Sequence, residues 1–134
     1  MSMMEDGAFG IKLVWPGYFE DPLAYERMGF PRDTNTRFDI PIHSKMLVYV
    51  TEYQLVMTVS KVTGTWEEGD ERYSPTGPFP LCLPIETLFR SEYGLSLKEV
   101  QKVVPHFRPR QGLSYFPISE AEFIELEREL HQKG

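Results

Sequence analysis

The sequence predicts a single α+β domain. Its 134 residues contain 41% hydrophobic and 25% charged residues, proportions typical of one globular domain that buries about two-thirds of its chain surface without a disulfide or metal. Short β-branched runs alternate with two helix-initiation patterns, and no internal repeat or low-complexity segment divides the chain. We therefore expect residues 10–134 to form the domain and residues 1–9 to form a flexible leader.

The first strand and the first helix are expected near the N-terminus. Residues 11–15 have the composition of a strand and are followed by a Pro-Gly turn signal. Residues 21–28 are expected to form about two turns of helix. Asp21 suits the N-cap, Pro22 suits the first helical position, and Gly29 suits the position just after the helix.

The middle of the chain predicts a β-hairpin between two long loops. Residues 45–50 and 54–63 are rich in β-branched side chains, and the link between them is short enough for a hairpin. Residues 30–44 and 64–78 hold several proline, glycine and asparagine or aspartate residues without a sustained hydrophobic period. Loops of this length are often functional.

The last third predicts two strands and two helices. Residues 79–89 form an expected strand whose prolines place it at an edge or a bulge, and residues 112–116 form a shorter one. Ser96 and Ser119 each precede a glutamate by three residues, which is the capping-box pattern that starts a helix. The helix after Ser119 carries apolar residues at helical spacing, so we expect it to cover the core.

The net charge of −6 argues against a protein that binds phosphate backbones over a wide surface, because such proteins carry arrays of lysine and arginine. The charge is unevenly distributed, however. Both ends of the chain are acidic, whereas residues 98–110 form a basic segment. This segment contains Lys98, Lys102, His106, Arg108 and Arg110.

The single cysteine and the N-terminal sequence point to the cytoplasm. Cys82 has no second cysteine with which to form a disulfide or share a metal, so we expect a buried structural thiol. The N-terminus lacks the charged and apolar regions of a signal peptide, and no apolar run approaches the roughly twenty residues of a membrane helix. A cytoplasmic protein with no membrane contact is expected.

The sequence contains none of the common signatures of catalysis, so we expect a protein that is not an enzyme. A P-loop, a dinucleotide-binding glycine pattern, a nucleophile elbow and zincin spacing are all missing. The three histidines are far apart, and we expect neither a metal nor a cofactor. A hydrolase that uses Glu67, Glu68, Asp70 and Glu71 is an alternative, but four acids in a glycine-bearing loop more simply form a solvated surface.

Aromatic residues are unusually frequent in the expected loops and strand ends. Several lie beside side chains that can form hydrogen bonds to a planar polar ring, and such a combination suits an unstacked base because stacking contributes about 1–3 kcal/mol per base. Packing in the core is the alternative for each ring. The aromatic residues are Trp15, Tyr18, Phe19, Phe30, Trp66, Tyr73, Phe107 and Tyr115, and the polar residues are Lys12, Arg32, Asn35, Arg37, Arg108, Arg110 and Gln111.

The order and spacing of these segments resemble the EVE family, one of the PUA-like domains related to the YTH and ASCH modules. The resemblance covers residues 10–131. Its features are the opening strand, the loop that begins Gly29-Phe30-Pro31, the hairpin, and the run 107–119 that leads into the last helix. Where EVE proteins often have Gly-Asp before the first hairpin strand, this chain has Ser44-Lys45.

The resemblance implies a small, curved, mostly antiparallel β-barrel of about five to six strands flanked by helices. It also implies a cleft that, in related families, accepts a modified base flipped out of a nucleic acid. The loop after the first helix matches at Phe30, Pro31 and Arg32, the segment after the hairpin matches at Gly64, Thr65 and Trp66, and the last junction matches at Arg108, Arg110 and Gly112.

We therefore predict a non-catalytic module that binds DNA or RNA at one modified or flipped base. Phe30 and Trp66 would stack on the base and Trp15 would form the floor. The alternative is a module for protein interaction or small ligands, in which the basic segment would lie away from Phe30 and Trp66. The remaining expected contacts to phosphates or base edges are Arg32, Asn35, Arg37, Arg108, Arg110 and Gly112.

Overall fold

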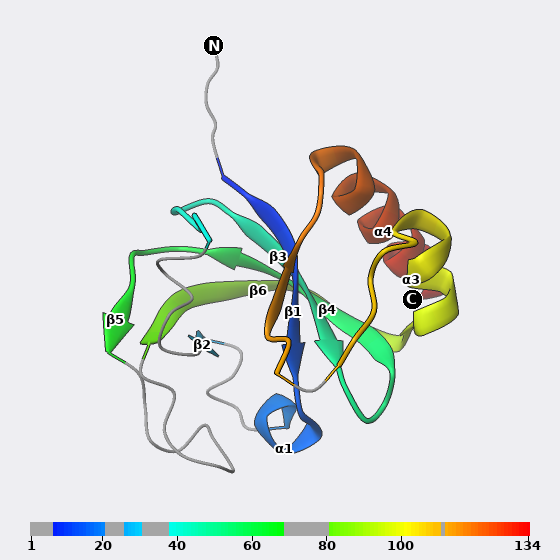
Figure 1. The fold of residues 1–134 in the computed structure, drawn as a ribbon, viewed down its shortest axis with the longest axis horizontal. Coiled ribbons are helices and arrows are strands. Elements are labelled where there is room, and N and C mark those ends of the chain that lie inside the picture. Colours follow the sequence, from blue (N-terminus) through cyan, green and yellow to red (C-terminus); the bar gives the residue numbers. More distant parts are fainter. Residues whose placement is uncertain (1–6, 21–25, 31–37, 69–80, 111) are drawn as a thin grey trace.

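The computed structural model describes residues 7–20, 26–30, 38–68, 81–110 and 112–134. These residues form one curled mixed sheet with helices against it (Figure 1). In chain order the elements are β1 (Phe9–Val14), α1 (Pro16–Phe19), β2 (Arg27–Phe30), β3 (Lys45–Val50), β4 (Leu55–Val62), β5 (Glu67–Glu68), β6 (Leu81–Ser96), α3 (Leu97–Val103), β7 (Tyr115–Pro117) and α4 (Glu120–Lys133).

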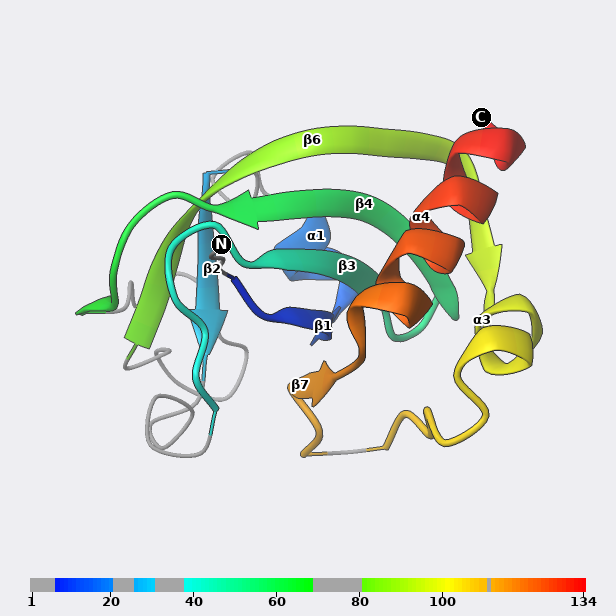
Figure 2. The ribbon, with the colours of Figure 1, turned by 90° about the horizontal axis from the view of Figure 1, so that it is seen from above.

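The order of neighbouring strands is β2-β6-β4-β3-β1-β7, and β5 pairs with β6. The expected hairpin is confirmed, because β3 and β4 pair in antiparallel fashion. Strand β1 inserts in parallel beside β3 and in antiparallel fashion beside β7. The long strand β6 arches over the sheet and joins β2 and β5 at one end to α3 at the other (Figure 2). The small curved α+β fold that the sequence predicts is therefore confirmed.

Alternation along β1 and β3 divides the core into two clusters. Val14, Met46 and Val48 lie in one cluster, whereas Ile11 and Leu47 lie in the other. The first cluster includes Phe30 of β2 and Tyr115 of β7, whose rings contact each other with centroids 6.3 Å apart. Because β2 and β7 are the two edges of the strand order, this cluster fills the inside of the curl. We call this side the inner face, and the side under α3 and α4 the outer face.

Both helices on the outer face begin at the capping boxes seen in the sequence. The hydroxyl of Ser96 accepts a hydrogen bond from the backbone N–H of Glu99, and Ser119 does the same for Glu122. Buried Phe123, Leu126 and Leu130 then hold α4 against the sheet. None of the helices in the described residues is long and apolar enough to cross a membrane.

The prediction of a helix at residues 21–28 is wrong for its last two residues. Residues 27–30 form β2, and Gly29 lies opposite Cys82 in the ladder with β6 rather than ending a helix. Met28 and Phe30 are buried on the inner face, so pairing and burial outweigh the local capping pattern. Residues 21–25 lie outside the described residues. A short helix forms instead at Pro16–Phe19, and β1 begins at Phe9, earlier than expected.

Substitution of Gly94 by alanine should destabilise the fold more than substitution of Gly112. Both glycines have a positive φ, 75° and 88° respectively, which costs an L-residue about 1–2 kcal/mol. A Cβ at Gly94 would also lie 2.9 Å from the carbonyl oxygen of Val56, whereas a Cβ at Gly112 meets nothing within 4 Å. We expect losses of about 2–4 and about 1 kcal/mol in urea unfolding. Equal losses would contradict this account of the close approach between Gly94 and the carbonyl of Val56.

Candidate functional site

A lysine is buried in the middle of the inner face. Lys12 occupies an inward position of β1 and its side chain is only 1% exposed. Its Nζ donates hydrogen bonds to the Ser114 hydroxyl at 2.6 Å and to the backbone carbonyl of Leu13 at 3.2 Å. It also lies 4.8 Å from the ring centroid of Phe30, within the range of a cation–π contact. The amine is therefore held in one place by strands β1 and β2 and the segment before β7.

Burial changes the protonation of this amine. Removal from water disfavours the ammonium form and lowers the pKa of Lys12 from 10.5 to about 7. Near neutral pH the group can therefore be a charged donor or a neutral amine. A ligand that offers an acceptor oxygen would stabilise the charged form, and one that offers a donor would stabilise the neutral form.

Tyr115 places a second polar group on the same face. It lies directly opposite Lys12 in the β1–β7 ladder and is 3% exposed. Within the described residues its hydroxyl has no hydrogen-bond partner, and burial raises its pKa. The ring passes over Gly10, where an added Cβ would lie 2.3 Å from the hydroxyl oxygen. An unsatisfied buried hydroxyl costs free energy that a bound ligand could recover.

Aromatic rings surround these two polar groups. Phe30 packs edge to face with Trp66, with centroids 5.1 Å apart, and Phe38 packs against Tyr115 at 5.2 Å. We call Lys12, Phe30, Phe38, Trp66, Ser114 and Tyr115 the inner-face cluster. Such a mixture of flat apolar walls and a few polar atoms is typical of sites that hold a planar polar ligand.

The structure brings some of the predicted site residues together. Phe30 and Trp66 are in direct contact, but the ring of Phe30 is fully buried, so Trp66 is the more accessible of the pair. Trp15 follows β1 and is 38% exposed, and its ring packs over Gly17 of α1. Gly112 lies just before Ser114, with a positive φ. The predicted Arg32, Asn35 and Arg37 lie outside the described residues.

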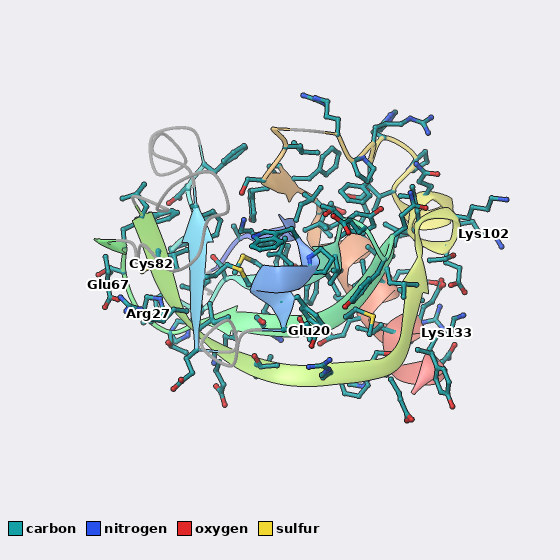
Figure 3. All side chains as sticks on the ribbon, turned by 90° about the horizontal axis from the view of Figure 1, so that it is seen from below. Glu20, Arg27, Glu67, Cys82, Lys102 and Lys133 are labelled. Atoms are coloured by element: carbon teal, nitrogen blue, oxygen red, sulfur yellow. The ribbon has the colours of Figure 1, made fainter. Side chains whose placement is uncertain are left out.

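The basic segment is only partly associated with this cluster. Arg108 and Arg110 are exposed on the segment that runs from α3 to β7, and this segment ends at Ser114 beside Lys12. Lys102 projects from α3, at the opposite end of the molecule from the region where β2 and β5 pair with β6 (Figure 3). Lys102 is therefore not part of one positive surface with Phe30 and Trp66.

The acidic loop considered for hydrolysis is described only at its start. Glu67 forms an ion pair with Arg27 at 2.9 Å, and Arg27 also donates to the buried thiol of Cys82 at 3.3 Å (Figure 3). The cysteine is thus buried as expected. Asp70 and Glu71 lie outside the described residues. Among the residues that are described, no group of three histidine, cysteine or acidic side chains could hold a metal ion.

Sequence reasoning named Lys12 and Tyr115 among many candidate polar and aromatic residues, but it did not include them in the predicted site, and it did not name Ser114 as a candidate. The signal was present in β1, where a lysine occupies a position whose neighbours on either side are apolar. A lysine at an inward position of a buried strand needs partners for its amine, and this marks a candidate site. The partners themselves come from a segment 102 residues away in the sequence, which the sequence pattern did not identify.

Comparison with solved structures places this fold among known ones. The ASCH protein of Zymomonas mobilis, in a single-residue variant, matches with a TM-score of 0.66 and 13% identity over 94% of this chain and 99% of that one. A hypothetical protein from Leishmania major matches with a TM-score of 0.72 and 15% identity, over 95% and 96%. A protein from Agrobacterium tumefaciens matches with a TM-score of 0.63 and 18% identity, over 91% and 92%.

These likenesses define the class of fold. The chain has the fold of the ASCH protein from Zymomonas mobilis. No protein-family model and no curated protein matches the sequence. The narrower resemblance to the EVE family stays a prediction.

The lowered pKa of Lys12 predicts how stability depends on pH. Between pH 7 and 10.5 the unfolded chain holds a proton on this lysine that the folded protein has released, so the wild-type protein gains stability as pH rises, by up to about 1.4 kcal/mol per pH unit. Below pH 7 the folded and unfolded states both hold the proton, so the free-energy cost of burying the charged amine is at its full value and no longer depends on pH. The variant Lys12→Met does not have this cost. In urea unfolding, the free energy of unfolding that Lys12→Met gains over the wild-type protein should therefore become smaller from pH 7 to pH 10.5. Parallel stability curves would contradict the burial of the amine.

Proposed function

We propose that this domain is a non-catalytic module that binds single-stranded RNA or DNA and holds one flipped or modified base at the inner-face cluster. The observation that carries the proposal is the pairing of Lys12 with Tyr115. The two residues lie directly opposite each other in the β1–β7 ladder; one carries a buried amine and the other an unsatisfied buried hydroxyl, and both pack among aromatic rings. The ASCH-type fold of the neighbours supports a nucleic-acid ligand, since PUA-like domains are commonly modules of that type. We also propose that the chain belongs to the EVE family within this group.

The chemistry of the cluster suits the edge of a nucleobase. The Lys12 ammonium can donate to a base oxygen or ring nitrogen, and the Tyr115 hydroxyl can donate or accept. Trp66 offers an accessible ring for stacking. Hydrogen bonding to base edges supplies selection, while stacking supplies affinity with little regard to sequence.

Phosphates would be held by few cations. Arg108 and Arg110 are exposed on the segment that leads to Ser114, so they lie on the chain path to the cluster. The net charge of −6 argues against a broad positive surface. The affinity should therefore fall only gently with salt, because few counterions are released.

Oligonucleotide binding tests this proposal. We expect Lys12→Met and Trp66→Ala each to lower the affinity for a labelled single-stranded RNA by about 5- to 150-fold, since each removes about 1–3 kcal/mol of contact. Arg108→Ala should lower the affinity less and flatten the salt dependence. Lys102→Met, at the far end of the molecule, is the matched control and should leave binding unchanged. Fluorescence anisotropy at two salt concentrations, with RNA and DNA containing or lacking methylated bases, measures all four.

Two results would count against the proposal. Binding that is lost in Lys102→Met but retained in Lys12→Met would place the nucleic acid on the basic segment alone. Absence of binding to every oligonucleotide would instead favour the alternative of a module for small ligands or protein partners, which the acidic net charge and the distant Lys102 support.

Catalysis at the same cluster is a second candidate function. Ser114 Oγ and Lys12 Nζ are 2.6 Å apart, and a lysine with a pKa of about 7 can serve as the base that activates a serine hydroxyl. The binding assay separates the two functions. Oligonucleotides recovered intact after prolonged incubation support recognition, whereas cleavage that is lost in both Ser114→Ala and Lys12→Met would establish catalysis.

A further inference from the structure

A second candidate site lies on the outer face, away from the inner-face cluster. A hollow of about 740 Å³ opens between the first part of α4 and the edge of the sheet where β1 and β3 begin and β4 ends. This volume lies within the usual range for small-molecule sites. The residues around it are Gly7, Phe9, His43, Lys45, Lys61, Glu120, Phe123, Ile124 and Glu127.

The hollow exists because α4 covers the sheet unevenly. Ile11, Leu47 and Val59 form one row across β1, β3 and β4, and all three are fully buried under the helices. Two residues along each strand, the next row is Phe9, Lys45 and Lys61, which are only half-buried. The helix therefore packs tightly on the first row and leaves space above the second.

The two walls of this hollow carry opposite charges. Lys45 and Lys61 lie directly opposite each other in the β3–β4 ladder, an arrangement of like charges that destabilises a sheet. Glu120 and Glu127 lie on the facing side of α4, two turns apart. None of the ion pairs within the described residues joins the lysine wall to the glutamate wall. Four charged groups thus line one hollow without neutralising each other.

The floor between the walls is apolar. The rings of Phe9 and Phe123 contact each other with centroids 5.2 Å apart, and the neighbouring Ile124 is 55% exposed. A flat apolar surface between two charged walls suits a molecule with a planar ring in the middle. Burial of Ile124 and of the exposed part of Phe9 would add to its affinity.

The rim beside Lys45 is held rigidly. His43 adopts a φ of 78°, and its backbone N–H donates to Val62 at the end of β4. The Ser44 hydroxyl accepts from the N–H of Ala8, so the turn is fixed to the segment before β1. Left-handed backbone in a residue other than glycine persists only where the surroundings enforce it. The position of Lys45, one residue after Ser44, is consequently defined before any ligand binds.

We propose that this hollow binds a nucleoside monophosphate whose base carries an exocyclic amine. The phosphate lies between Lys45 and Lys61, the base packs on Phe9 and Phe123, and the amine donates to Glu120 or Glu127. Inorganic phosphate would leave the acidic wall unsatisfied, and a nucleoside without phosphate would leave the lysine pair unneutralised. A ligand with an anion at one end and N–H donors at the other satisfies both walls.

Three nucleotides test the site by calorimetry on the whole protein. AMP should bind more tightly than adenosine, which lacks the phosphate, and more tightly than IMP, which replaces the amine by a carbonyl. Lys61→Met should weaken AMP at least about tenfold, because it removes a charged hydrogen bond. Glu127→Gln together with Glu120→Gln should reduce the preference for AMP over IMP. Lys98→Met, on exposed α3, is the matched control and should change nothing.

The outcomes also separate this site from the inner-face cluster. Lys12→Met should leave AMP binding intact even if it abolishes oligonucleotide binding. AMP binding that is lost in Lys12→Met and kept in Lys61→Met would overturn the proposal, since the nucleotide would then occupy the inner face. Equal affinities for AMP and adenosine, or no binding of AMP at millimolar concentration, would overturn it as well. Lys61→Met also relieves a like-charge contact, so loss of binding should not reflect loss of folding.

Discussion

The burial of the Lys12 amine is the constraint on which the inner face depends. A charged group removed from water needs polar partners. Ser114 and the carbonyl of Leu13 accept hydrogen bonds from the amine, and the face of the Phe30 ring lies within cation–π range of it. Ser114 and Phe30 are distant from Lys12 in the sequence. They meet only when β7 pairs with β1 and when the curl of the sheet brings β2 across to β7. The polar site is therefore a product of the completed fold rather than of one loop, and its geometry is as rigid as the sheet.

The two faces of the sheet serve different purposes. The inner face combines aromatic rings with two buried polar groups, which favours recognition of a planar polar ligand. The outer face is covered by Phe123, Leu126 and Leu130 of α4, and a hollow opens at the end where Lys45 and Lys61 lie. Strand β6 runs past both β2 and β4, because Leu81–Pro84 pair with β2 and Ile85–Ser96 pair with β4. A ligand on one face would not compete with a ligand on the other.

Much of the fold follows from local sequence, and much of the site does not. The hairpin of β3 and β4 and the two capped helices have strong local signals, and they form where expected. The prediction of a helix that ends at residue 28 was wrong, because Gly29 resembles the residue that follows a helix. The burial of Met28 and Phe30 instead depends on pairing with β6, more than fifty residues away in the sequence. The sequence prediction placed Phe30 and Trp66 in the same cleft, and the two rings are in contact. The role of Lys12 was not predicted, because nothing local identifies Ser114 or Tyr115 as its neighbours.

Titration of the Lys12 amine by NMR, with ¹³C-labelled lysine and with the oligonucleotide present or absent, tests the central claim most directly. In the free protein the side chain should titrate with a pKa of about 7, well below that of the other lysines. A bound base that accepts a hydrogen bond from the ammonium stabilises the charged form, so a saturating oligonucleotide should raise this pKa. A Lys12 that titrates like an exposed lysine, or one whose pKa does not change when the nucleic acid binds, would contradict the account of the inner face as the recognition site.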